Sequence, residues 1–202
     1  MKITLIGASG LAKDLIDIFR YENYIREVAL FDNISDIQEK KLYNTHDILT
    51  SIDELQKRFK EVSPFFITAI GSPRKRKEIS QQLETIGGYN FSYICSQSLV
   101  SQYSTISERG VIIQMSCQIS SDVVIEDGVF LNVRCMIGHD VKIGKYTTLS
   151  PDVKLLGNAV IGENCVLATG VTVMPNVKIG NNVKIGMNKL VTEDVPDGTM
   201  LI

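Results

Sequence analysis

An aliphatic residue stands at every sixth position over much of the second half of this chain. The series runs without a break through Ile113, Ile119, Ile125, Leu131, Ile137, Ile143, Leu149, Leu155, Ile161, Leu167, Val173, Ile179, Ile185 and Val191. A second series, mostly small or β-branched, lies two positions earlier in each hexad and is broken only at Lys189. A period of six fits neither an α-helix nor a hairpin meander. It predicts short strands joined by tight corners and stacked as a parallel β-solenoid with an apolar ladder inside.

This spacing resembles the hexapeptide repeat of the left-handed β-helix acyltransferases over residues 98–196. In those proteins three hexads make one triangular coil, which would place Cys117 directly beneath Cys135 as inward core filler. Glycine follows the aliphatic residue in several hexads, where we expect it to allow the unusual backbone angles of a corner. These glycines are Gly138, Gly144, Gly162, Gly180 and Gly186.

The first half of the chain has a different pattern, in which apolar runs alternate with amphipathic segments. Strands are expected over 2–8, 27–33 and 65–71, and helices over 11–20, 51–59 and 74–88. Ser9 is expected near one helix N-cap, and Ser51 with Glu54 forms the pattern of a capping box. The alternation predicts a small Rossmann-like parallel α/β domain at residues 1–96, followed by the β-helix at 97–202.

The turn after the first strand is a candidate phosphate-binding loop. Gly7, Ser9 and Ala12 occupy the glycine positions of the dinucleotide fingerprint, which makes a weak match, and Gly10 lies between them. Backbone amides at the helix start would meet a phosphate or a sugar. Asp32, after the second strand, would bind a ribose or a base, or would serve as a loop or helix-cap carboxylate.

Composition favours a soluble cytoplasmic protein. The 202 residues carry 21 basic and 23 acidic side chains, a formal charge of −2 that provides no attraction to nucleic acid or an anionic membrane. The N-terminal segment lacks the features of a signal peptide, and no apolar run is long enough for a membrane span. Because the four cysteines lack close pairing, we expect free thiols and neither a disulfide framework nor a metal site.

Three motifs stand out in order along the chain: GASGL at 7–11, AIGSPRKR at 69–76 and GHD at 138–140. Together with the domain order they resemble the sialic acid O-acetyltransferase family, which includes N-acetyltransferases of UDP-linked 4-amino-4,6-dideoxy sugars in bacterial surface glycan biosynthesis. The resemblance implies acetyl-CoA as co-substrate, a nucleotide-linked amino sugar as acceptor and a homotrimer with sites at subunit interfaces. It assigns sugar-nucleotide binding to Ser9, Gly10, Leu11, Asp32, Asn33 and Arg76. It assigns acetyl-CoA binding to Thr148, Thr169 and Met187.

Two residues depart from the family pattern. Leu11 stands where the family usually carries a histidine, which removes a polar group near the sugar. Thr148 stands where relatives carry a second histidine that approaches acetyl-CoA.

His139 is the candidate general base, because a nucleophile that attacks a thioester must lose a proton as the bond forms. Asp140 would orient the imidazole and stabilise its charged form without taking the proton itself. The same dipeptide occurs as His46–Asp47, in an irregular polar stretch where an exposed loop is expected. That position supplies an internal comparison for His139.

Three functions fit the sequence: N-acetylation of a nucleotide-linked amino sugar, O-acetylation of sialic acid or another sugar, and sugar-nucleotide binding by a non-catalytic β-helix scaffold. A zinc-dependent carbonic anhydrase on this fold is disfavoured, because such a site needs three ligands and the repeat contains a single histidine.

Overall fold

The computed structural model describes residues 1–35 and 39–202, and the chain divides into two compact units. Unit 1 comprises Met1–Gly71 and Lys75–Phe91, and unit 2 comprises Ser72–Arg74 and Ser92–Ile202. Unit 2 thus takes in residues 92–96, which the sequence pattern places in the α/β domain. The reason is a hydrogen bond of 2.7 Å from the Tyr93 amide to the Val111 carbonyl, which adds this segment to the stack of coils.

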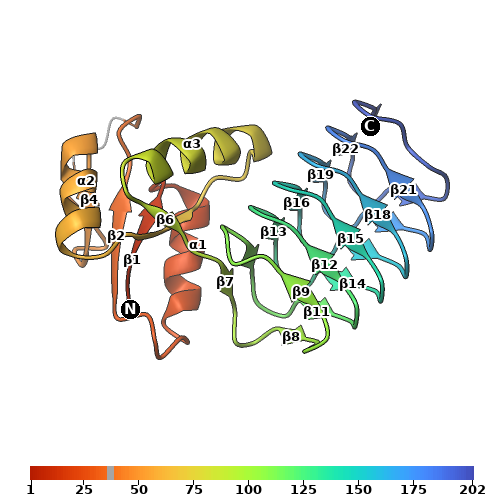
Figure 1. The fold of residues 1–202 in the computed structure, drawn as a ribbon, viewed down its shortest axis with the longest axis horizontal. Helices are drawn as coiled ribbons and strands as arrows, with labels where there is room; N and C mark the ends of the chain where they lie inside the picture. The colour runs from red at the N-terminus through yellow and green to blue at the C-terminus, as the bar shows by residue number, and fades with distance from the viewer. Residues whose placement is uncertain (36–38) are drawn as a thin grey trace. The chain divides into compact units, whose positions relative to one another are not determined.

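Unit 1 is built on a mostly parallel sheet with the strand order β3-β4-β2-β1-β5-β6 (Figure 1). Its strands are β1 Lys2–Ile6, β2 Glu27–Phe31, β3 Lys41–Leu42, β4 His46–Leu49, β5 Phe65–Thr68 and β6 Tyr89–Asn90. The helices are α1 Gly10–Phe19, α2 Ile52–Glu61 and α3 Pro73–Thr85. The three predicted strands and three predicted helices are all present. The antiparallel pair β3 and β4 was not predicted, because both strands are short and polar.

The prediction for His46 is wrong, because this residue begins β4 and does not lie in a loop. Its imidazole is half-buried, and Nδ1 lies 3.1 Å from the carbonyl oxygen of Val28. The polar sequence around it concealed a strand whose pairing with β2 and β3 is decided by the sheet.

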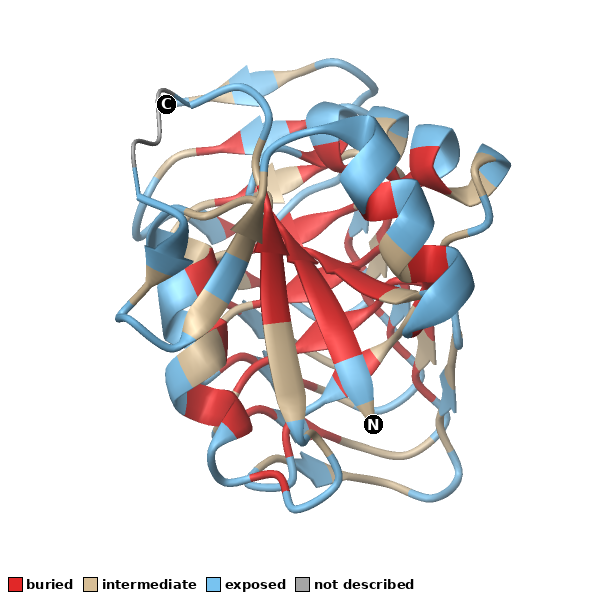
Figure 2. Cartoon of the chain, turned by 90° about the vertical axis from the view of Figure 1, so that its left-hand side faces the viewer, coloured by how far each residue is buried: buried red, intermediate tan, exposed pale blue. Residues whose placement is uncertain are grey.

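Helices α2 and α3 pack on the sheet through one apolar cluster. Its buried members are Ile6, Phe31, Leu55, Phe59, Phe66 and Leu83. The capping box at Ser51 and Glu54 is confirmed, with the Glu54 amide donating to Ser51 Oγ over 3.3 Å. Figure 2 shows the central strands buried along most of their length, as expected for a sheet covered by helices.

An ion-pair cluster at the start of β1 and β2 makes the stability of unit 1 dependent on pH. Lys2 first, and Arg58 in addition, hold the pKa of Glu27 below its ordinary 4.5, although burial opposes them. The lowered pKa means that this stabilisation is present above pH 4.5 and is lost as the pH falls through the pKa of the folded state. We expect Glu27→Gln to flatten the acid limb of a plot of unfolding free energy against pH, by at most about 1 kcal/mol because the pair is solvent-screened. Glu61→Gln is the control, and equal flattening in both variants would contradict the assignment.

Unit 2 is a parallel β-helix whose strands repeat in three sheets, visible as successive coils in Figure 1. The first sheet contains β7 Tyr93–Ile94, β10 Ile112–Ile113, β13 Phe130–Leu131, β16 Thr148–Leu149, β19 Val166–Leu167, β22 Lys184–Ile185 and β24 Met200–Leu201. The second contains β8 Leu99–Val100, β11 Gln118–Ile119, β14 Met136–Ile137, β17 Lys154–Leu155, β20 Thr172–Val173 and β23 Leu190–Val191. The third contains β9 Thr105–Ile106, β12 Val124–Ile125, β15 Lys142–Ile143, β18 Val160–Ile161 and β21 Lys178–Ile179.

The aliphatic series and the apolar members of the second series form one continuous core, as predicted. The parallel register joins Ile119, Ile137, Leu155 and Val173, so each residue packs on the one three hexads away. All four cysteines are free and buried. Cys117 and burial together raise the pKa of the Cys135 thiol, which keeps it protonated and inert.

The corner glycines were predicted to adopt unusual backbone angles, and this prediction is wrong. Positive φ angles occur two residues after these glycines, for example at Asp140 (φ 61°) and Asn164 (φ 57°). Gly138 itself is required by close packing, because a Cβ there would lie 2.8 Å from the backbone nitrogen of Gly157. The glycines therefore let neighbouring coils stack, while Asn, Asp and a few other residues adopt the left-handed corner.

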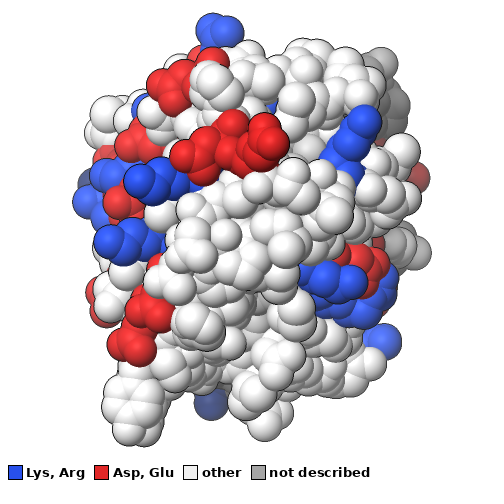
Figure 3. All heavy atoms as spheres, turned by 90° about the vertical axis from the view of Figure 1, so that its right-hand side faces the viewer, with Lys and Arg blue, Asp and Glu red and all other residues white. Residues whose placement is uncertain are grey.

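Charge is spread thinly over the surface, in keeping with the formal charge of −2. On the face drawn in Figure 3, Lys and Arg side chains are interspersed with Asp and Glu around a mostly uncharged area.

Candidate functional site

The corner between β14 and β15 carries the predicted catalytic pair. Nδ1 of His139 lies 2.8 Å from Oδ2 of Asp140, and the two side chains are 63% and 51% exposed. Buried Ile137 and Val141 anchor the chain on either side. The corner between them therefore presents both polar side chains to solvent.

The backbone of Asp140 explains how the pair is held in place. Its φ of 61° belongs to the left-handed region, which Asp and Asn tolerate better than most residues. The Asp140 amide donates to the carbonyl of Ser121 in the preceding coil over 3.1 Å. Asn158 occupies the same corner position in the following coil, with a φ of 62°. Asp140 thus forms a regular corner of the β-helix and also contacts His139.

The three residues assigned to acetyl-CoA by resemblance differ in accessibility. Thr148 begins β16 and is only 7% exposed, flanked in register by Phe130 and Val166. Thr169 is half-buried in a corner, and Met187 is 70% exposed in another. Met187 offers the most surface to a ligand, and the three assignments stay predictions.

Unit 1 contains a cavity of about 460 Å³ at the carboxyl ends of its strands. Residues that follow β1, β2 and β5 line it together with side chains from α3. The lining includes Gly7, Ser9, Leu11, Asp32, Asn33, Ile34, Ser35, Ile70, Gly71, Lys75 and Gln82. Strand β1 lies between β2 and β5, so the strands after β1 are first added on one side of it and then, from β5, on the other. Such a switch point is where open α/β sheets bind ligands.

Asp32 organises the wall of this cavity. Its Oδ1 accepts hydrogen bonds from the amides of Ile34 (3.0 Å) and Ser35 (2.9 Å), and Oδ2 accepts one from the Ser35 hydroxyl (2.9 Å). Burial raises the pKa of Asp32, but these donors and the Ala8 amide outweigh it and hold the pKa below its ordinary value. Asp32 is therefore an ionised loop carboxylate beside the cavity, the structural alternative that the sequence left open.

Of the six residues assigned to sugar-nucleotide binding, four line the cavity: Ser9, Leu11, Asp32 and Asn33. Gly10 is the first residue of α1. Arg76 is fully buried, and its Nη1 donates to the carbonyls of Ile70 (3.0 Å) and Gly71 (3.1 Å). Arg76 thus contributes to the cavity by holding the loop after β5.

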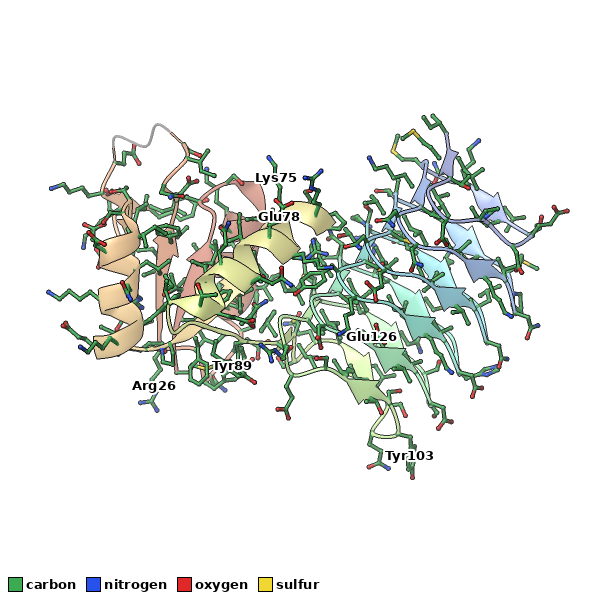
Figure 4. All side chains as sticks on the ribbon, turned by 45° about the horizontal axis from the view of Figure 1, so that its top comes forward. Arg26, Lys75, Glu78, Tyr89, Tyr103 and Glu126 are labelled. Atoms are coloured by element: carbon green, nitrogen blue, oxygen red, sulfur yellow. The ribbon has the colours of Figure 1, made fainter. Side chains whose placement is uncertain are left out.

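Sequence reasoning did not single out Gln82 or Ile34, which also line the cavity. Gln82 was detectable, because it shares one face of α3 with Lys75 and Ile79 at helical spacing. Figure 4 shows Lys75 and Glu78 projecting from this helix. Ile34 could not be recognised, because its place on the rim depends on the turn that Asp32 makes.

Another cavity, of about 500 Å³, lies among the last coils of unit 2, between the segments 189–195 and 200–202. None of the predicted site residues lines it. Within residues 1–35 and 39–202, no group of three or more His, Cys, Asp or Glu side chains is arranged to hold a metal ion. In the same residues, no helix combines the length and apolarity that crossing a membrane requires.

Two family models match parts of the chain. Residues 2–83 match the family described as the PglD N-terminal domain, and residues 158–193 match the bacterial transferase hexapeptide family. The predicted combination of a family-specific N-terminal domain with hexapeptide repeats is therefore confirmed. No curated protein matches this sequence.

Solved structures with the same fold cover nearly the whole chain. PerB from Caulobacter crescentus, in complex with CoA and GDP-perosamine, is 23% identical with a TM-score of 0.86, covering 99% of this chain and 93% of PerB. The acetyltransferase domain of PglB from Neisseria gonorrhoeae, in complex with acetyl coenzyme A, is 23% identical with a TM-score of 0.87, covering 98% and 94% of the two chains. WeeI from Acinetobacter baumannii is 22% identical with a TM-score of 0.87, covering 99% and 96%. These similarities establish the predicted fold from end to end.

Proposed function

We propose that this chain, which joins a PglD N-terminal domain to hexapeptide repeats, transfers the acetyl group of acetyl-CoA to the amine of a nucleotide-linked amino sugar. The observation that carries the proposal is the exposed, hydrogen-bonded His139–Asp140 pair in a corner of the β-helix. Two relatives of the same fold support it, since PerB was crystallised with CoA and GDP-perosamine and the PglB domain with acetyl coenzyme A.

The pair is suited to general base catalysis. When Nδ1–H of His139 donates to Asp140, Nε2 carries the lone pair that accepts a proton. The amine attacks the thioester carbonyl, its proton passes to Nε2, and the C–S bond breaks as the tetrahedral intermediate collapses. The imidazolium then returns the proton to the departing CoA thiolate. Asp140 stabilises the charged imidazole without itself being protonated.

The cavity of unit 1 is the proposed nucleotide site. The amides at the start of α1, around Ser9 and Gly10, suit a phosphate group through the helix dipole. Lys75, which also lines the cavity, supplies a positive charge. Leu11 makes one side of the cavity apolar where the family usually has histidine, so the chemistry of the acceptor is where this chain should differ from its relatives.

The loop held by Asp32 provides a test of the nucleotide site. We expect Asp32→Ala to weaken binding of the preferred nucleoside diphosphate about tenfold, because the amides of Ile34 and Ser35 lose their acceptor and the wall loosens. Titration calorimetry with UDP, GDP and dTDP measures the change. Glu27→Gln, at the other end of β2, is the control. Unchanged affinity in Asp32→Ala would remove the cavity from the proposal.

The function itself is tested by incubating the protein with acetyl-CoA and a panel of acceptors, while the release of free thiol is followed. The panel contains UDP-, GDP- and dTDP-linked amino sugars, the corresponding hydroxy sugars and sialic acid. Mass spectrometry of the product distinguishes an amide from an ester, and hence N- from O-acetylation. If no acceptor in the panel leads to thiol release although the protein binds a nucleotide tightly, the non-catalytic scaffold would be supported instead.

Oligomeric state and location complete the proposal. The resemblance predicts a homotrimer and the composition predicts a cytoplasmic protein, and light scattering on active protein measures the assembly. A catalytically active monomer would contradict the trimer.

A further inference from the structure

We infer that Gly157 is a positioning residue for His139, and that it acts by having no side chain. A Cβ built on Gly157 would lie 2.7 Å from both Cε1 and Nε2 of His139, and 3.3 Å from Nδ1. Real Cβ atoms essentially never approach another atom within 3.0 Å. The imidazole therefore rests directly on the backbone of Gly157. The inference rests on the proposed role of His139 as the base.

The stacking of coils brings Gly157 to this place. Strands β14 and β17 pair in register, and the Gly138 amide donates to the Leu155 carbonyl over 2.8 Å. On the other side of Gly157 along the chain, the Asn158 amide donates to the carbonyl of His139 over 2.9 Å. These two hydrogen bonds fix Gly157 opposite His139 with little freedom to withdraw.

Backbone conformation does not explain the glycine. Positive φ in this corner belongs to Asn158, and Gly157 is not among the residues with positive φ. The same position of neighbouring hexads carries side chains, at Lys145, Pro151 and Glu163. Gly157 is thus a glycine at a hexad position where the neighbouring hexads have side chains. It lies where a side chain would clash with the ring of His139.

The contact with Gly157 involves the edge of the ring that carries the catalytic nitrogen. Nδ1 is engaged by Asp140, so Nε2 must accept the proton of the nucleophile. The Cε1–Nε2 edge of the ring is the part closest to Gly157. A methyl group there must displace the ring from Asp140 or cover Nε2, and either change removes the base from its working position.

We expect Gly157→Ala to lower kcat about 100-fold, the scale of a displacement near 1 Å at a reacting group, while KM for both substrates changes less than about twofold. A second readout is independent of activity. The chain has two histidines, so long-range ¹H–¹⁵N spectra give two imidazole patterns, and His46→Gln assigns them. The variant should shift the Nε2 and Cε1–H signals of His139 and leave those of His46 in place.

Two comparisons separate positioning from a general effect on the fold. Gly186→Ala adds a methyl group to another coil, where it meets the Leu201 carbonyl oxygen at 3.2 Å, and should leave the His139 signals unchanged. The thermal midpoint should fall only slightly in Gly157→Ala, because the methyl strikes an exposed side chain that can turn away. It should recover in Gly157→Ala/His139→Ala, since the second change removes that ring. If the single variant does not fold, recovery of folding in the double variant supports the contact.

Wild-type imidazole signals in Gly157→Ala, or thermal losses that persist unchanged in the double variant, would overturn the inference. If the proposed function is wrong but the inference about Gly157 is right, the results differ: no acceptor is acetylated, yet Gly157→Ala still shifts the His139 signals.

Discussion

His139→Ala should lower kcat for acetyl transfer by about 10²–10⁴-fold, the usual contribution of a positioned general base. Its side chain is 63% exposed and, among residues 1–35 and 39–202, hydrogen-bonds to Asp140 alone, so removing it should leave the fold intact. Binding of acetyl-CoA should change little, because the base contributes when the proton moves. Steady-state kinetics on the best acceptor and calorimetry with CoA separate these effects.

The chain supplies its own control for this substitution. His46→Gln changes the other His–Asp dipeptide, which lies in the sheet of unit 1, and should retain wild-type kcat. Asp140→Asn keeps a residue that tolerates the left-handed corner and removes only the charge. It should reduce kcat less than His139→Ala. Full activity in His139→Ala would refute the mechanism.

Leu155→Ala should destabilise the β-helix by about 2–5 kcal/mol, the range for a buried leucine whose site cannot collapse. Leu155 is completely buried, and its strand pairs on both sides with strands that carry Ile137 and Val173 at the same register. The surrounding coils are held by regular backbone hydrogen bonds, so they cannot move inward to fill the space. Urea unfolding at constant protein concentration measures the loss.

Lys154→Ala is the matched control, because Lys154 is the other residue of β17 and is exposed. Its effect on the free energy of unfolding should stay within about 0.5 kcal/mol. A loss below about 1 kcal/mol for Leu155→Ala would mean that the ladder is loosely packed, contrary to its burial.

The repeat made the β-helix predictable because each hexad carries the same information. An inward aliphatic residue at every sixth position predicted a continuous ladder, and the family resemblance, which implies three hexads per coil, predicted the register of Ile119, Ile137 and Leu155. The position of His139 in a corner followed from the same count. The corner glycines showed the limit of local reasoning, because Gly138 is explained by a backbone atom nineteen residues away and not by its own φ angle.

The α/β unit was predictable in its elements but less so in its site. Alternating apolar and amphipathic segments predicted the strands and helices, and the loops after β1 and β2 were identified as candidate binding loops. Arg76 was assigned to the ligand by resemblance, and the structure shows it fully buried with a hydrogen bond to the loop after β5. Whether a charged side chain faces the ligand or holds the wall cannot be seen in a linear pattern, because it depends on how the next strand packs.

The amino-acid sequence by itself determined the period of the solenoid, a change of architecture predicted at residues 96–97, and the corner that carries His139 and Asp140. These features depend on side-chain periodicity along the chain, which the linear sequence shows directly. Tertiary structure alone decided that the His139 imidazole rests on Gly157, that Asp32 is an acceptor for its own loop, and that His46 lies in a strand. Each of these depends on the distance between atoms that coil stacking or sheet pairing brings together, and that distance is set by packing of the surrounding elements.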